Sequence, residues 1–235
     1  MTEVNSHSSK TQVSRDVHRE FENHVIKSCM KCVKNPTYFT TGIAEECAEF
    51  LDAVKLTKFD QKVNVQHDRD AYRLVISEAG DLLWYLYALS LSLPGGKFST
   101  LTANVSEKDQ IPNPVSCFYD ENEKFFSRIQ THGNSICCSD VEELRDLKDQ
   151  LCSAMGKLCG SVKKFSRGDK VWDTFQKRIQ QDIDILLWTL VQIFLLLPKC
   201  LNAPEITLQT AMRYNIEKIN SRMSNGVIRG DGENR

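Results

Sequence analysis

Two short groups of acidic residues have a spacing that suits chemistry with a metal ion. The first follows the pattern EExxE and the second the pattern ExxD. Residues three apart share one face of a helix, so Glu46 points with Glu49 and Glu78 with Asp81. Both groups adjoin apolar stretches, where carboxylates are costly unless a partner neutralises them. Because Mg²⁺ prefers carboxylate oxygens, the pattern predicts a magnesium site with a catalytic role.

Length, composition and charge are those of an ordinary globular protein. The chain has 235 residues, of which 41% are hydrophobic and 26% charged, and its formal net charge is −1. This length fits one large domain or two small ones. A net charge near zero gives no electrostatic basis for binding nucleic acid or a membrane, so we expect neither as a partner.

The ends of the chain and its longest apolar run bear on location. Residues 1–14 are polar and rich in Ser and Thr, which predicts a disordered tail and no secretory signal. The run at residues 185–198 is too short to span a membrane and contains Thr189 and Gln192, so it predicts a buried helix. We therefore expect a cytoplasmic protein, with a nuclear or organellar location also open.

The cysteines predict reduced thiols. There are nine of them, an odd number, in a chain with no predicted secretory signal. Cys29 and Cys32 have the CxxC spacing, but no second CxxC or nearby pair of histidines completes a zinc site. Unligated thiols are the favoured interpretation, and an interaction module that uses this pair to bind zinc is an alternative.

Apolar residues recur with helical periodicity along most of the chain, and no strand pattern is evident. This predicts an all-α protein. The first predicted helix begins at Asp16 and closes at Asn35-Pro36, and the third ends at residues 93–96. The other predicted starts lie after Gly42, after the polar loop at residues 60–69, at the capping box of residues 139–142, near Trp172 and near Glu205.

An internal repeat divides the helical region into two halves. Leu-Leu-Trp at residues 82–84 recurs at 186–188, and Leu-Pro at 93–94 recurs at 197–198. Each half predicts one helical hairpin, so the two together predict a four-helix-bundle core.

The second half lacks the acidic pattern. Glu78 aligns with Asp182, whereas Asp81 aligns with Ile185. Two alignments are open for the EExxE group, and neither restores a carboxylate. One places Leu151, Cys152 and Met155 at its acidic positions, and the other places Gly156, Lys157 and Gly160 there. The second hairpin is therefore predicted to carry a degenerate metal site.

We expect these parts to form a single compact domain. Its parts are a disordered tail (1–14), a catalytic helical half (15–96), a linker (97–118), a degenerate helical half (119–200), and a C-terminal helix with a Gly-rich tail (201–235).

The acidic pattern, taken with the run Leu-Leu-Trp-Tyr at residues 82–85, resembles the all-α nucleoside triphosphate pyrophosphohydrolases. This superfamily includes MazG, the dimeric dUTPases and the dCTP pyrophosphatases. The resemblance covers residues 21–93 and resumes near the C-terminus. There, residues 215–222 look like the N-x-x-K helix of MazG-like proteins, and residues 226–235 resemble their G-x-I-x-G-x-G-x-x-R tail.

The resemblance implies an enzyme that cleaves an NTP or dNTP to a nucleoside monophosphate and pyrophosphate, for nucleotide-pool sanitation or dNTP control. The implied cofactor is Mg²⁺, with Mn²⁺ as a substitute. The implied metal ligands are Glu46, Glu49, Glu78 and Asp81, and Glu45 would orient or deprotonate the attacking water. The implied substrate-binding residues are Tyr85, Asn215, Lys218 and Arg222.

The chain departs from the single-hairpin relatives in one respect. In those relatives the N-x-x-K helix follows the ExxD helix directly, whereas here the degenerate hairpin intervenes. We infer that this second half packs as an internal copy of a dimer partner and supplies Asn215 and Lys218 to one site. The protein would then be a monomeric pseudo-dimer or a homodimer. The alternative is a catalytically inactive helical protein that binds a nucleotide or a partner protein.

Overall fold

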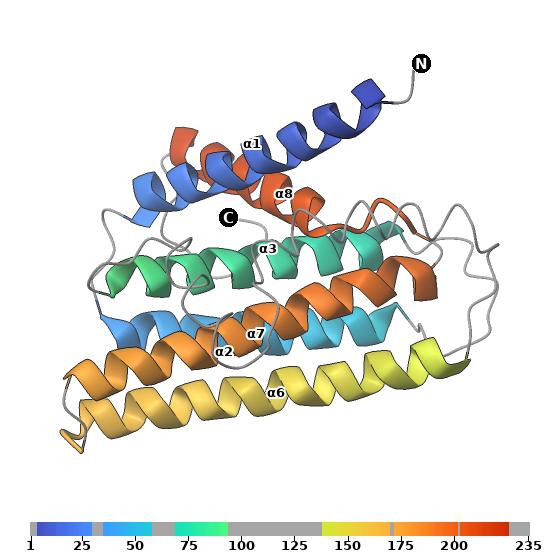
Figure 1. Cartoon of the computed structure of the whole chain (residues 1–235). Helices are drawn as coiled ribbons and strands as arrows, with labels where there is room; N and C mark the ends of the chain where they lie inside the picture. The colour runs from blue at the N-terminus through green and yellow to red at the C-terminus, as the bar shows by residue number, and fades with distance from the viewer. Residues whose placement is uncertain are drawn as a thin grey trace.

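The described part of the chain is built from α-helices. The computed structural model describes residues 4–29, 35–57, 69–93, 138–169, 172–201 and 203–225. Its helices are α1 (Val4–Cys29), α2 (Pro36–Leu56), α3 (Arg69–Ser92), α6 (Cys138–Ser166), α7 (Trp172–Leu201) and α8 (Leu208–Ser224) (Figure 1). No strand occurs in these ranges, which confirms the predicted all-α class. The predicted linker (97–118) and Gly-rich tail (226–235) lie outside the described residues.

Helix α1 begins earlier than the sequence predicts. Residues 4–14 are polar and were expected to belong to a disordered tail, but the helix runs from Val4. Once later turns are fixed, each further residue adds to a helix at little cost. Here Val17, Phe21 and Val25 are buried and fix those turns. The prediction of a disordered tail is therefore wrong for residues 4–14.

Helix α2 begins at Pro36, a residue expected to close the preceding helix. Asn35 caps the new helix, since its Oδ1 accepts a hydrogen bond from the backbone N–H of Thr37 at 2.9 Å. Proline suits the first helical position because its missing N–H would have no partner there. The predicted start after Gly42 is therefore too late, and Gly42 is buried within the helix.

The remaining helix boundaries lie close to their predicted positions. Helix α3 ends at Ser92, next to the predicted end at residues 93–96. After α6 comes a turn in which Gly168 has a φ of 81°. Helix α7 continues past Pro198 to Leu201, three residues beyond the apolar run at residues 185–198. A proline removes one helical hydrogen bond, but the buried side chains on either side of it can still hold a final turn.

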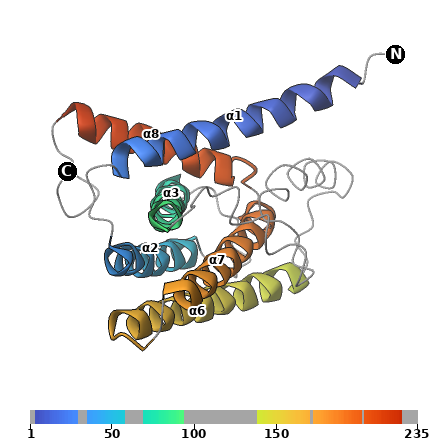
Figure 2. The ribbon, with the colours of Figure 1, turned by 60° about the vertical axis from the view of Figure 1, so that its left-hand side comes forward.

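The helices of each half pack against each other as a hairpin. Helix α2 packs along α3, and α6 packs along α7, while α2 also contacts α6. The start of α2 meets the end of α6, where Thr37 Oγ1 lies 3.2 Å from Ser166 Oγ. Figure 2 shows α3 between α2 on one side and the crossed pair α1 and α8 on the other. Helix α3, which carries the ExxD group, is therefore contacted from both sides.

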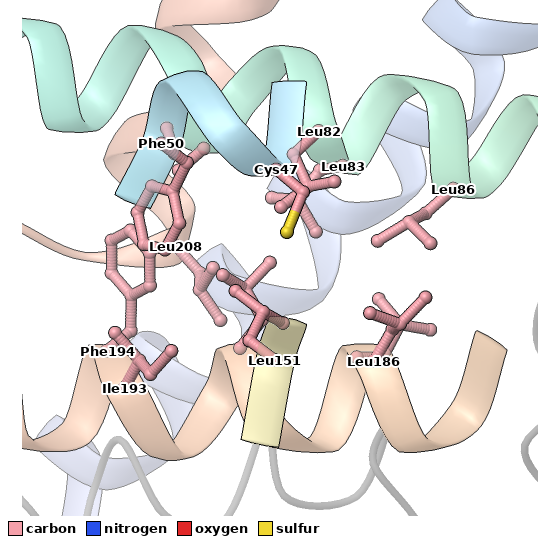
Figure 3. Close-up of a cluster of buried hydrophobic side chains, with 14 of the residues drawn as sticks. Cys47, Phe50, Leu82, Leu83, Leu86, Leu151, Leu186, Ile193, Phe194 and Leu208 are labelled. Carbon is pink, nitrogen blue, oxygen red and sulfur yellow. The ribbon is translucent and has the colours of Figure 1, made fainter. Parts of the chain in front are cut away.

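Apolar side chains fill the space between the two hairpins. Phe50 of α2 stacks on Phe194 of α7, with ring centroids 5.9 Å apart (Figure 3). Cys47 lies in the same cluster, and burial raises the pKa of its thiol to about 12. Burial of such side chains is the main force that holds helices together. The helices that carry the acidic groups are thus held in place by a packed apolar core.

Two described helical segments, Asp70–Ser92 and Thr174–Leu201, are long and apolar enough to cross a membrane by length and composition. In the most apolar window of each, 78% and 67% is buried inside the protein. Core helices have this property, and the second segment contains the run at residues 185–198 that we predicted to be a buried helix.

Candidate functional site

Three glutamates from two helices converge at the face where α2 meets α3. One carboxylate oxygen each from Glu46, Glu49 and Glu78 can lie within 4.8 Å of the others. Glu78 is buried, Glu46 is half-buried and Glu49 is exposed. The packing of α2 along α3 thus brings together the two acidic groups that the sequence singles out.

Glu46 lies in a strongly unfavourable environment for a carboxylate. Burial raises its pKa to about 9, with further contributions from the charges of Asp81, Glu78 and Glu49, while Lys218 acts in the opposite direction. Without additional positive charge, this side chain therefore keeps its proton at neutral pH. A divalent cation would supply that charge and favour the carboxylate form.

Helix α8 brings two polar side chains to Asp81. The Nδ2 of Asn215 donates to Asp81 Oδ1 at 2.6 Å, and the Nζ of Lys218 donates to Oδ2, also at 2.6 Å. Asn215 is fully buried, and the side chains of Lys218 and Asp81 are only 13% and 16% exposed. Asn215 and Lys218, the predicted N-x-x-K pair, therefore contact the ExxD group directly, although the α6–α7 hairpin separates them in the sequence.

Ser77 is a member of this network that the sequence analysis missed. It is buried on α3, and its Oγ accepts a hydrogen bond from Lys218 Nζ at 3.0 Å. Burial lowers the pKa of Lys218, but the charge and hydrogen bond of Asp81, with the charge of Glu78, outweigh this and raise it. Lys218 is therefore a permanent positive charge beside the acids. No sequence motif marks Ser77, which stands just outside the ExxD pattern.

Gly80 allows α8 to approach α3 this closely. A Cβ at this position would lie 2.7 Å from the backbone oxygen of Ala211 and 3.0 Å from Cβ of Asn215. Contacts this short would force α8 away from α3. The sequence signal was available, because a glycine inside an apolar helical stretch often marks a close approach of another backbone.

An aromatic pair borders the acidic cluster. The ring of Tyr85 packs directly over Gly42, where any Cβ would clash with it, and the ring of Tyr38 lies 6.3 Å away. Burial raises the pKa of Tyr85, and Tyr38, Glu46 and Glu45 add to the effect. Tyr85 therefore keeps its hydroxyl proton. Sequence reasoning selected Tyr85 but missed the exposed Tyr38, which stands outside both acidic motifs.

The two other predicted site residues lie at the edge of this group. Glu45 is exposed on α2, and its charge acts on the nearby Tyr85. Arg222 is half-buried in the last turn of α8, and repulsion by its positive charge lowers the pKa of Lys218. The structure thus brings the predicted residues of three helices into one region.

The donor atoms of this region fit a hard divalent cation. Three carboxylates share one space, and oxygen ligands of this kind are preferred by Mg²⁺ and Mn²⁺. In addition, the Oδ1 of Asn215 is buried and has no hydrogen-bond partner among the described residues. The thiols of Cys47, Cys152, Cys159 and Cys200 form no disulfide, while Cys32 lies outside the described residues. The zinc alternative stays a prediction.

Comparison with known proteins yields one weak similarity. The chain is similar to the Gene 37 protein of Mycobacterium phage L5, with 28% identity over 100 residues, which is 42% of this chain and 82% of the phage protein. That name states no activity. No protein family matches the chain, and the search of solved structures also found no match.

Proposed function

We propose that this protein is a Mg²⁺-dependent nucleoside triphosphate pyrophosphohydrolase of the MazG-like, all-α type. The observation that carries the proposal is the contact of Asn215 and Lys218 with Asp81. A carboxylate cluster for a cation and a basic group for phosphate are the two parts that this reaction needs, and here they meet on three helices. A cluster of acids on a solvated helix face would not account for the partly buried lysine and the buried asparagine beside it.

The acidic residues would hold the cation. Glu46, Glu49 and Glu78 supply three oxygens, and Asp81 adds a fourth carboxylate next to them. When bound, Mg²⁺ would polarise the phosphoryl group and lower the pKa of a coordinated water. Glu45, which is exposed on α2, would orient that water or accept its proton.

Basic and aromatic side chains would hold the substrate. Lys218 and Arg222 provide positive charge on one face of α8 for the phosphates and for the pyrophosphate leaving group. Tyr85, with its hydroxyl protonated, can donate a hydrogen bond to a sugar or phosphate oxygen. The products would be a nucleoside monophosphate and pyrophosphate. Sanitation of the nucleotide pool and control of a dNTP are the two roles that fit this reaction.

A hydrolysis panel tests the proposal. Purified protein would be offered each common and modified NTP and dNTP with Mg²⁺, and monophosphate and pyrophosphate would be quantified. We expect pyrophosphate release by the wild type and its loss in Asp81→Ala, with circular dichroism and thermal melting showing that the variant folds. Mn²⁺ is expected to support the reaction in place of Mg²⁺.

The same panel can reject the enzyme. A folded wild-type protein that turns over none of these nucleotides would overturn the proposal and favour a helical protein that binds a nucleotide or a partner. Nucleotide binding measured by calorimetry would then separate these two kinds of ligand. Sedimentation of the same sample would decide between a monomeric pseudo-dimer and a homodimer.

A further inference from the structure

Both carboxylate oxygens of Asp81 accept hydrogen bonds from side chains of α8. Lys218 Nζ and Asn215 Nδ2 each lie 2.6 Å from one of them. The acids that share the common space are Glu46, Glu49 and Glu78. A cation bound by those three would therefore lie beside a carboxylate that is already paired with a positive charge.

We propose that Lys218 is a built-in counter-ion of Asp81 and that a divalent cation displaces it. Asp81 then completes the cation site, and the amine of Lys218 is released to the substrate phosphates. This inference rests on the proposed function, because it concerns the same cation and the same phosphates. It assigns Lys218 two successive partners, one before and one after the cation binds.

The charges around Lys218 favour this exchange. Its amine is close enough to Glu46 and Glu78 for their charges to act on one another. A divalent cation at those two acids would repel the ammonium group while attracting the carboxylate of Asp81. Lysine is a point charge on a flexible four-carbon stem, so it can change partners without a movement of its helix.

The surroundings of Asp81 and Lys218 also suit the second state. Asn215 can keep its hydrogen bond to Asp81 and so hold the carboxylate in place. Its Oδ1 has no hydrogen-bond partner among the described residues. Arg222 already acts against the charge of Lys218, so an anion received by both would relieve that repulsion. The cation would bind Asp81 and the phosphate would bind Lys218. Each ligand would therefore favour the binding of the other.

A Mn²⁺ titration without nucleotide, read by electron paramagnetic resonance, tests the exchange. We expect Lys218→Met to bind Mn²⁺ at least about tenfold more tightly than the wild type, because the competing charge is gone. The matched control is Lys199→Met, which removes a similar ion pair outside the site, with Asp140 at 2.7 Å. The control should change the affinity by less than about twofold. Equal affinity in wild type and Lys218→Met would overturn the exchange.

A crystal structure of the wild type with Mn²⁺ and no nucleotide decides the matter independently, even if Lys218→Met does not fold. We expect anomalous density for Mn²⁺ within coordination distance of Asp81, with Lys218 Nζ no longer paired to that carboxylate. Density beside Glu46, Glu49 and Glu78 alone, with Lys218 still on Asp81, would overturn the exchange and leave the proposed function standing. A wild type that binds no Mn²⁺ would overturn both.

Discussion

The two hairpins each bury an acidic residue at positions that the internal repeat aligns, and they neutralise it differently. In the α6–α7 hairpin, the partners of Asp182 belong to the same hairpin. Ser161 donates a hydrogen bond to its Oδ2 at 2.7 Å, and the Nε of Arg178 lies 3.3 Å from its Oδ1. In the α2–α3 hairpin, Glu78 belongs to a group of acids whose nearby cation, Lys218, comes from α8.

This difference separates a structural acid from a candidate functional one. Asp182 has a local partner, and because the side chain of Arg178 is 53% exposed, the net effect of their ion pair on stability is small. Several acids gathered in one place raise one another's pKa, as the pKa of Glu46 shows, and such clusters concentrate at functional sites. The contact of Ser161 with Asp182 also favours the alignment that places Lys157 and Gly160, rather than Cys152 and Met155, at the degenerate acidic positions.

The largest expected effect comes from neutralising an acid of the α2–α3 hairpin. Glu46→Gln removes a cation ligand and should lower kcat/KM by on the order of a thousandfold. Glutamine imitates the protonated form that burial favours, so the variant should fold at least as stably as the wild type. Steady-state kinetics with the substrate from the hydrolysis panel, together with thermal melting, would measure both effects.

Asp182→Asn is the matched control in the second hairpin. It keeps the shape of the side chain and lies outside the proposed site, so kcat/KM should stay within about twofold of the wild type. A loss of activity in Asp182→Asn as large as that in Glu46→Gln would contradict the division of labour between the hairpins.

A pair of glycine substitutions tests the close packing of α8 on α3. Gly80→Ala places a Cβ against the backbone of Ala211, so we expect a loss of about 1–3 kcal/mol in the free energy of unfolding and weaker phosphate binding. Gly156→Ala lies in open space on α6 and should instead add about 0.5–1 kcal/mol. Urea unfolding of the two variants compares them directly. Effects of the same sign would contradict the claim that Gly80 is needed for the close approach of α8 to α3.

The last prediction concerns Asp184 of α7, a buried acid whose two oxygens have no hydrogen-bond partner among the described residues. Burial raises its pKa from 3.8 to about 7. The folded state therefore binds this proton more tightly than the unfolded state, and the free energy of unfolding falls as the pH rises from about 4 to about 7. Above that range the carboxylate is charged in both states, and its full burial cost remains.

Asp184→Asn removes this titration. We expect the variant to be more stable than the wild type at pH 8, by on the order of 1–3 kcal/mol, and nearly equal to it at pH 4. Urea midpoints measured across this pH range provide the test. Parallel pH profiles for the two proteins would show that Asp184 does not titrate in this interval.

Much of the fold could be predicted because helical periodicity is a local property. The apolar spacing correctly predicted an all-α protein, and the predicted end of α3 at residues 93–96 lies next to its observed end at Ser92. Local signals also misled. Asn35-Pro36 opens α2 instead of only closing the preceding segment, and residues 4–14 continue a helix that their polar composition does not indicate. Capping and helix extension depend on what neighbouring turns bury, which composition alone does not report.

For the site, the sequence by itself determined which side chains share a face of one helix. The pairing of Glu46 with Glu49, and of Glu78 with Asp81, follows from three-residue spacing. The resemblance led us to expect Lys218 in the same site as the acids. Only the tertiary structure showed that α8 crosses α3 at Gly80 and that Lys218 contacts Asp81, a residue 137 positions earlier in the chain. The physical reason is that such a contact depends on the packing of whole helices, and no local pattern of residues encodes that packing.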